Sequence, residues 1–223
     1  MSEAIGSILA LAAGVAISPL PIMAVILILF TPKARTNGPA FAAGWVLGLA
    51  AVAAVTLVIF DPQNFTDEAP TNVAAALHLA LGVLLLWLGV RRWRSRPGPG
   101  ELPTPPKWMS GLATLGTLQA VGLAALLAGL NPKNTVLTIS AAVSVAQHEL
   151  GGGETAAVMA IYIAIASLTV ATPVALLVFA PTKAQPILDR WRTGLMEHGV
   201  IVGVTLFFVF GALLVGKGIA ELT

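Results

Sequence analysis

A single lysine stands inside a long apolar stretch of the sequence, with polar side chains around it. Residues 111–146 contain one charged residue, Lys133, which directly follows Pro132. Four polar residues lie three, four and seven positions apart and therefore share one face of a helix: Asn131, Asn134, Thr135 and Thr138. An ammonium group with amide and hydroxyl neighbours can attract an anionic or phosphate-bearing group. We therefore take Lys133 as the centre of a candidate binding site.

The length of this stretch leaves two positions open for Lys133. As one straight helix, its 36 residues would reach roughly 54 Å, well beyond the roughly 30 Å of hydrocarbon in a bilayer. Lys133 would then lie about 33 Å along the axis, at the outer interface, and would extend its ammonium group to the headgroups. A break at Pro132 instead places Lys133 and its asparagine neighbours in a polar cavity. The shared polar face favours the break, because a lysine at the interface needs no such face.

The first apolar stretch, residues 4–30, contains a second proline motif, Ser18-Pro19-Leu20-Pro21. A proline removes one backbone donor and clashes with a carbonyl one turn earlier, so a regular helix cannot continue through it. Such breaks survive in hydrocarbon only where protein or a polar cavity covers them. Two breaks in corresponding spans predict a binding site near the middle of the membrane. The residues expected to contact substrate are Ser18, Pro19, Pro21, Asn131, Pro132, Lys133, Asn134, Thr138 and Tyr162.

Composition assigns the elements that carry these residues to a membrane. Of the 223 residues, 57% are hydrophobic and 10% are charged, whereas an average soluble domain has about 25% charged residues. A spanning helix needs about 20 mostly apolar residues. We expect an all-α polytopic membrane protein with six transmembrane helices, in residues 4–30, 37–60, 69–90, 111–146, 155–180 and 199–216.

The positions of the basic residues predict the orientation. Ten of the twelve lysines and arginines lie in three loops, which alternate with two loops that have none. By the positive-inside rule the three basic loops are cytoplasmic, so both termini should be extracytoplasmic, and we expect the plasma membrane as the location. The ten residues are Lys33, Arg35, Arg91, Arg92, Arg94, Arg96, Lys107, Lys183, Arg190 and Arg192.

Three spans in each half predict an internal duplication. An odd number of spans per half puts similar halves in opposite orientations, which is the pattern of an inverted repeat. The proline motifs lie in the first span of each half, and similar glycine patterns lie in the third. We expect a first three-helix repeat over residues 1–93, a Pro/Gly-rich cytoplasmic linker over 94–110 and a second three-helix repeat over 111–223.

Smaller polar and glycine signals lie in the other spans. His78 lies about two turns into the third span and could titrate near neutral pH, although a histidine at an interface is the simpler interpretation. Tyr162, Thr169 and Thr172 put hydroxyls on one side of the fifth span, where they either line a pathway or form interhelical hydrogen bonds. The Gly44-x-x-x-Gly48 motif in the second span predicts close helix packing.

The residue types that several other functions need are missing from the sequence. It has no cysteine, which excludes disulfides, thiolate metal sites and cysteine nucleophiles. It also has no His-Glu-x-x-His, Gly-x-Ser-x-Gly or phosphate-binding Gly-rich motif, and no pair of carboxylates within a span. We therefore expect no enzyme activity, no cofactor and no metal site. The net charge of +2 gives no support to nucleic-acid binding.

The six spans, the two proline motifs and the basic, proline-rich central loop resemble the lysine-exporter (LysE) superfamily over essentially the whole chain. Within it, the chain is most similar to the GAP branch, named for glycolipid-addressing proteins. Amino-acid exporters of the superfamily usually have Pro-Gly-Pro where this chain has Pro19-Leu20-Pro21, which argues against assuming an amino-acid substrate. The resemblance implies a small exporter or facilitator, linked in this branch to moving glycolipids to the cell surface.

These inferences lead to one leading hypothesis and two alternatives. The leading hypothesis is alternating access to a midplane site between the halves, where Lys133 attracts an anionic or lipid substrate. An exporter of a small solute, such as an amino acid or an ion, would share this pathway without the lipid. A non-transporting membrane scaffold for a lipid synthesis or export complex needs no polar pathway. Membrane lipids are the expected partners, and a homodimer is plausible because six short spans enclose little volume.

Overall fold

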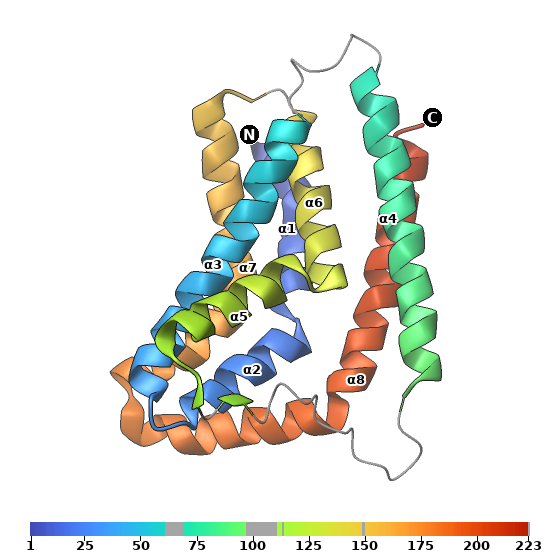
Figure 1. The fold of residues 1–223 in the computed structure, drawn as a ribbon. Helices are drawn as coiled ribbons and strands as arrows, with labels where there is room; N and C mark the ends of the chain where they lie inside the picture. Colours follow the sequence, from blue (N-terminus) through green and yellow to red (C-terminus); the bar gives the residue numbers. More distant parts are fainter. Residues whose placement is uncertain (61–68, 97–110, 113, 149, 223) are drawn as a thin grey trace.

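The computed structural model describes residues 1–60, 69–96, 111–112, 114–148 and 150–222, and within them it contains helices and no strand (Figure 1). The helices are α1 (Ser2–Ala16), α2 (Pro19–Leu29), α3 (Ala34–Ile59), α4 (Ala69–Arg94), α5 (Thr117–Gly129), α6 (Pro132–Ala146), α7 (Gly152–Phe179) and α8 (Pro181–Ala220). The all-α fold is therefore confirmed for the described part of the chain. Most of the expected linker 94–110, with Lys107, lies outside the described residues.

Four helices are long and apolar enough to cross a membrane, namely α3, α4, α7 and α8. A fifth span results if α1 and α2, which meet at an angle of 51°, are counted as one broken span. The stretch expected as the fourth span consists of α5 with 13 residues and α6 with 15, and each is shorter than the about 17–25 residues of a spanning helix. The described residues thus support a multi-pass membrane protein with four or five candidate spans, and the count of six stays a prediction.

Both breaks expected at the proline motifs are present. α2 begins at Pro19 and α6 begins at Pro132, and two residues separate each of them from the helix before it. The residues before these prolines, Ser18 and Asn131, have extended backbone with ψ of 109° and 113°. The proline ring imposes this conformation, because a helical one at the preceding residue would clash with the ring. The breaks therefore follow from local chemistry.

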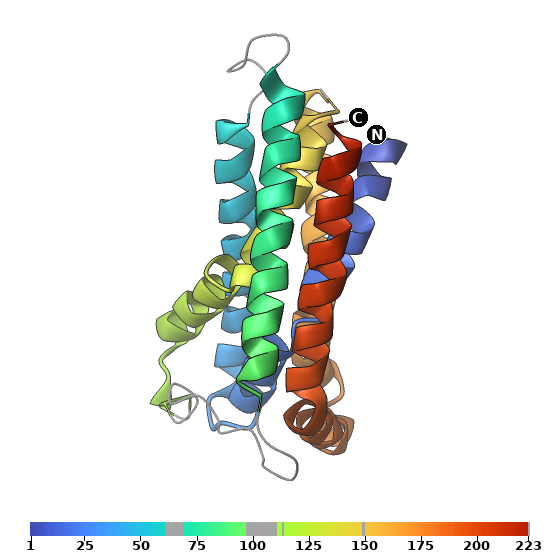
Figure 2. The same ribbon diagram turned by 90° about the vertical axis from the view of Figure 1, so that its right-hand side faces the viewer.

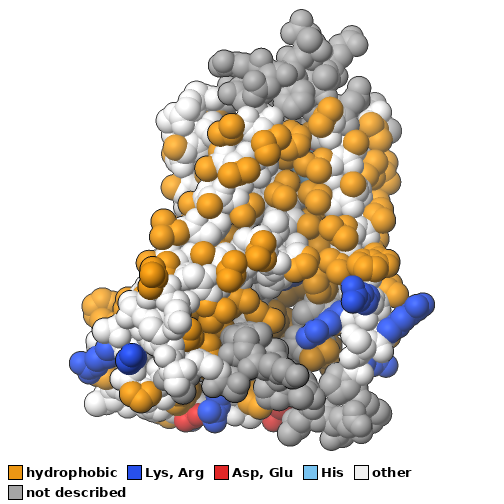
Figure 3. Space-filling model, viewed as in Figure 1, with side chains coloured by type: hydrophobic (Ala, Val, Ile, Leu, Met, Phe, Trp, Pro, Cys, Tyr) orange, Lys and Arg blue, Asp and Glu red, His pale blue; other side chains and the backbone are white. Residues whose placement is uncertain are grey.

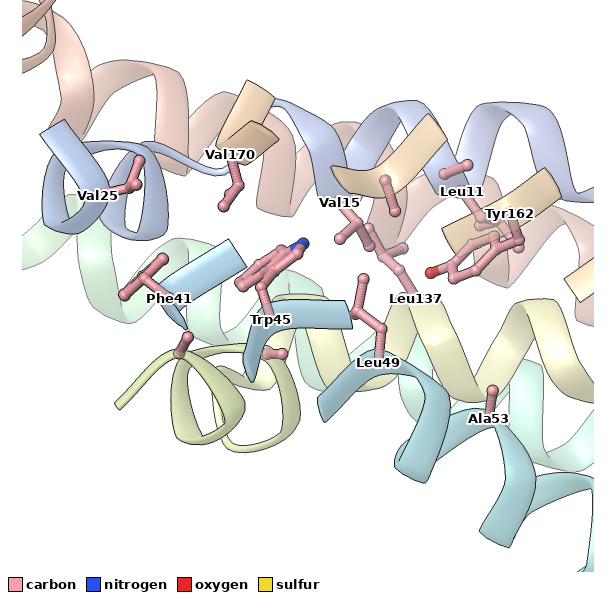
Figure 4. Packing of buried hydrophobic residues seen from close by; sticks show 14 of the residues in the cluster. Leu11, Val15, Val25, Phe41, Trp45, Leu49, Ala53, Leu137, Tyr162 and Val170 are labelled. Atoms are coloured by element: carbon pink, nitrogen blue, oxygen red, sulfur yellow. The ribbon is translucent and has the colours of Figure 1, made fainter. Parts of the chain in front are cut away.

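The long helices pack beside one another and against the broken ones. α8 lies beside α4, and α5 lies beside α3 (Figures 1 and 2). α1 contacts both α6 and α7, so the first break lies against the second half of the chain. Side chains of α1, α3, α6 and α7 meet in the apolar core, among them Val15, Trp45, Leu137 and Tyr162 (Figure 4).

The Gly44-x-x-x-Gly48 motif of α3 packs directly against the backbone of α5. A Cβ atom at Gly44 would lie 2.7 Å from the Cα atom of Val121, and one at Gly48 would lie 2.8 Å from the Cα atom of Ala125. Only residues without a side chain allow two helix backbones to come so close. The close packing predicted from this motif is confirmed, and its partner is α5.

The longest helix, α8, changes direction along its length. Its first part lies across one end of the molecule, and its second part stands beside α4 (Figure 1). Figure 3 shows lysine and arginine side chains gathered toward the same end, below an apolar surface. Both termini lie at the opposite end (Figures 1 and 2). This distribution fits the predicted topology, whereas the side of the membrane that each end faces stays a prediction.

Candidate binding site at the helix breaks

The break between α1 and α2 leaves carbonyl groups without their usual helical donors. A helix satisfies each carbonyl with the N–H group four residues later, and Pro19 has no N–H to offer. Two side chains from the second half of the chain donate hydrogen bonds to carbonyls at this break. Lys133 Nζ donates a hydrogen bond to the carbonyl of Gly14, and Thr169 Oγ1 of α7 donates one to the carbonyl of Ala16. Polar side chains therefore cover this break.

The break between α5 and α6 is covered by side chains of α6. Asn134 Nδ2 donates to the carbonyl of Leu127 over 3.4 Å, and Thr135 Oγ1 donates to the carbonyl of Gly129 over 2.7 Å. These carbonyls lie five and three positions before Pro132, as those of Gly14 and Ala16 do before Pro19. At both breaks, carbonyls at equivalent positions before the proline accept hydrogen bonds from side chains.

A buried hydrogen bond joins the two breaks. Ser18 Oγ donates to Asn134 Oδ1 over 2.8 Å, and the exposed fractions of these residues are 1% and 0%. The network continues along α6, where Thr138 Oγ1 donates to the carbonyl of Asn134 over 2.8 Å. Thr138 Oγ1 also lies 3.0 Å from the hydroxyl of Tyr162 on α7. A continuous chain of polar groups therefore runs from the first break through α6 to α7.

Lys133 is a buried lysine without an acidic partner among the described residues. Only 3% of the residue is exposed, and the ion pairs among the described residues do not include it. The structure thus places Lys133 inside the protein at the second break, and not at an outer interface. As the second residue of α6, it also lies where the helix dipole favours negative charge. A buried ammonium group without a counter-ion is costly, so an anion that reached it would be bound favourably.

The structure brings five of the nine expected site residues into one group, namely Ser18, Lys133, Asn134, Thr138 and Tyr162. The three prolines shape the breaks, and Asn131 caps α6 from a half-buried position without a side-chain cap bond. Sequence reasoning missed the Gly14 carbonyl, since a backbone acceptor has no signature in the sequence. It placed Thr169 in a polar stripe but did not assign it to the site.

An open groove of about 420 Å³ lies beside the first break, between α2, α7 and the first part of α8. We call it the α8 groove. Its walls are mostly apolar, and Arg190 and Trp191 lie along it. Thr169, which covers the Ala16 carbonyl, is also part of the wall. The residues that line the α8 groove are Ile22, Thr169, Thr172, Arg190, Trp191, Gly194 and Leu195.

Both breaks and the α8 groove fall within a stretch that matches a known protein family. The sequence model of this family, described as Sap, sulfolipid-1-addressing protein, matches residues 8–220. The chain belongs to this family. No curated protein and no solved structure matches the chain. Membership in the sulfolipid-1-addressing family supports the glycolipid-addressing resemblance, and the wider lysine-exporter superfamily stays a prediction for this family member.

Ser18→Ala tests the hydrogen bond between the breaks. We expect it to lower the free energy of unfolding by about 1–2 kcal/mol, because the buried amide oxygen of Asn134 loses its donor. Reversible unfolding of the purified protein by dodecyl sulfate in mixed micelles measures this loss. The matched control is Ser7→Ala, whose hydroxyl bonds to the Ala4 carbonyl of its own helix. Equal losses in the two variants would contradict a special role for Ser18.

Proposed function

We propose that this chain moves an anionic lipid or glycolipid across the plasma membrane by alternating access, without enzymatic chemistry. The observation that carries the proposal is Lys133, a buried lysine without an acidic partner among the described residues, placed where two helix breaks meet. Broken helices at the middle of a membrane are typical of transporter binding sites. Lys133 binds the anionic headgroup, while Ser18 and Asn134 separate and re-form their bond as the halves rock.

The family description and the α8 groove both favour a lipid as the substrate. The family is named for addressing a sulfolipid, which is an amphiphile with an anionic group. The α8 groove offers a matching surface, because its apolar walls accept an acyl chain and Arg190 attracts an anionic headgroup. The groove adjoins the first break through Thr169. In our proposal the lipid enters here from the cytoplasmic leaflet and its headgroup then reaches Lys133.

The order and packing of the helices support two inverted repeats as the moving parts. The sequence of a broken pair followed by two long helices occurs twice, as α1–α2, α3, α4 and as α5–α6, α7, α8. α1 packs against α7, and its counterpart α5 packs against α3. In our proposal α5 and α6 together form the fourth of six spans, and both termini are extracytoplasmic. Rocking of one repeat against the other then exposes Lys133 to each side in turn.

Lipid transfer in vesicles tests the proposed function directly. The protein is reconstituted in phosphatidylcholine vesicles with a trace of fluorescent phosphatidylglycerol, and external dithionite bleaches the label in the outer leaflet. We expect the inner-leaflet label to become bleachable faster with the protein than without it. Fluorescent phosphatidylcholine tests the need for an anionic headgroup, and release of trapped lysine tests the small-solute alternative. Transfer at the protein-free rate, or lysine release without lipid transfer, would overturn the proposal.

A non-transporting scaffold is the second candidate function, and one observation favours it. Ser18, Asn134, Thr138 and Tyr162 bond to one another, so the centre is closed in this structure. Because the chain has no cysteine, single cysteines at positions 18, 131 and 162 distinguish the two functions. In a transporter they react with water-soluble maleimides from at least one side, whereas in a scaffold they stay inert. We expect them to react.

Arg190→Ala tests the α8 groove as the route of the anionic lipid. Loss of one basic residue at the membrane surface removes about 1 kcal/mol of attraction for an anionic lipid, so we expect transfer of fluorescent phosphatidylglycerol to slow about fivefold. Transfer of fluorescent phosphatidylcholine should change less. Lys183→Ala is the matched control, since Lys183 lies exposed on the same part of α8 and does not line the groove. A similar effect of both variants would indicate general surface charge instead of the groove.

A further inference from the structure

A second polar cluster joins His78 on α4 to the C-terminal end of α8. The C-terminus and the N-terminus lie at the same end of the molecule (Figures 1 and 2). None of the surface of His78 is exposed. Its Nδ1 atom lies 2.7 Å from Glu221 Oε2, directly after α8, and its Nε2 atom lies 3.5 Å from the carbonyl of Ser140 on α6. The imidazole ring therefore connects α8 to α6 through α4.

A lysine and a serine extend the cluster. Lys217 Nζ of α8 donates to Ser144 Oγ of α6 and lies 3.9 Å from Glu221 Oε1. Ser144 Oγ in turn donates to the carbonyl of Ser140 over 2.6 Å. We call His78, Glu221 and Lys217, with Ser140 and Ser144, the His78 cluster. It holds an acid, a base and a cation within hydrogen-bond or ion-pair distance at a junction of three helices.

The imidazole of His78 is the group in the His78 cluster that can accept one further proton. With a neutral imidazole, the carboxylate of Glu221 and the ammonium of Lys217 balance each other. A proton on the imidazole would be held by the carboxylate 2.7 Å away. Of the titratable groups near these helices, His148, two residues after the end of α6, bonds to the Ser144 carbonyl over 2.7 Å. The acids at 61, 67 and 68 lie outside the described residues. Imidazole is the side chain best suited to take up and release protons near neutral pH.

The position of the cluster links it to the Lys133 site through one helix. α6 carries Lys133 and Asn134 at its beginning, where they bond to the first break. Further along it carries Ser140 and Ser144, which contact His78 and Lys217. A change in the bonds of the cluster therefore acts on the same rigid helix that holds the substrate site. Two sites are coupled when both of them influence the position of one structural element, which here is α6.

We propose that His78 and Glu221 form a proton-binding site that drives the transport cycle through α6. The inference rests on the proposed function for the cargo and goes beyond it by naming the driving ion. In the cycle, His78 takes up a proton from the side of the termini, and the imidazolium then pairs with Glu221. The contact of Nε2 with the Ser140 carbonyl and the pairing of Lys217 change with it, and α6 moves relative to α1. Release of the proton on the other side resets the helix.

Proton binding is measured on the full-length protein in detergent micelles by NMR of labelled histidine. The three histidines are assigned with His→Gln variants at positions 78, 148 and 198. We expect the His78 ring signal to shift as the pH falls from about 8 to about 5, and Glu221→Gln to move the midpoint of that shift. A His78 signal that stays constant over this range would overturn the proposal.

Coupling is measured on vesicles that contain the protein. With fluorescent phosphatidylglycerol as the probe, one pH unit of external acidity should speed transfer to the outer leaflet by up to about tenfold. His78→Gln and Glu221→Gln should both lose this response. His198→Gln should keep it, because His198 is exposed on α8 and belongs to no part of the cluster. A full pH response in both cluster variants would overturn the coupling.

A readout without lipid separates this inference from the proposed function. In a Ser18→Cys variant, the rate of reaction with a water-soluble maleimide, corrected for the intrinsic pH dependence of a thiol, should depend on pH. Adding His78→Gln should remove that dependence. If both results are obtained but no lipid moves at any pH, the transport of lipid is wrong and the proton site is supported. If lipid moves and Ser18→Cys reacts independently of His78, the proton site is wrong and the proposed function stands.

Discussion

Lys133→Met is expected to abolish transfer of fluorescent phosphatidylglycerol in vesicles while the protein stays folded. In the proposed complex the ammonium group of Lys133 pairs with the anionic headgroup, and removal of one partner from a buried ion pair costs about 3–5 kcal/mol. Transfer should therefore fall by at least about a hundredfold. Methionine matches the length of the lysine chain, and the Gly14 carbonyl that loses its donor should lower the free energy of unfolding by about 1–3 kcal/mol. Size-exclusion elution and dodecyl sulfate unfolding check that the variant is folded.

Two variants control for this result. Lys183→Met removes an exposed lysine from the first part of α8 and should transfer lipid at the normal rate. Lys133→Arg keeps the charge with a larger planar group, so it should retain part of the transfer if charge at this position matters. Wild-type transfer by Lys133→Met would show that the buried lysine has no role in transport.

Gly44→Ala is expected to cause the largest loss of stability among Gly→Ala substitutions at the described glycines. The new Cβ atom would overlap the backbone of Val121 on α5, and it has no flexible side chain there to push aside. The helices α3 and α5 must separate, at a cost of about 3 kcal/mol, the upper part of the usual range for overpacking. Since α5 leads directly into the second break, its displacement from α3 also disturbs the site at Lys133. Dodecyl sulfate unfolding measures the stability, and lipid transfer measures the site.

Gly122→Ala is the matched control on the partner helix. A Cβ atom at Gly122 would meet nothing within 4 Å, and alanine is the better helix former by about 1 kcal/mol. This variant should therefore unfold no more easily than the wild type. Equal destabilisation by the two substitutions would contradict the direct contact between the α3 and α5 backbones.

The membrane class, the two breaks and the close approach at Gly44 could all be predicted from the sequence. Each of them depends on properties of neighbouring residues. The apolar stretches exclude water, the rings at Pro19 and Pro132 stop a helix wherever they occur, and a missing side chain permits close packing in any membrane helix. The count of six spans stays a prediction, because the stretch around Lys133 divides into two short helices.

The partners of the polar residues were decided by the tertiary structure. Ser18 bonds to Asn134, and His78 pairs with Glu221, which is 143 positions away. Lys133 bonds to a carbonyl of α1, and the sequence pattern that singled out this lysine carries no information about a backbone acceptor in another helix.

The physical reason is the difference between local and distant interactions. Periodicity, charge and proline placement act along the chain and determine which segments are helical, apolar or broken. Burial of a polar group is tolerated only where another group meets it in space, and that meeting depends on how α1, α4, α6, α7 and α8 pack together. The sequence alone therefore identified Lys133 as exceptional, and only the packed helices showed that it lies buried at the junction of two breaks.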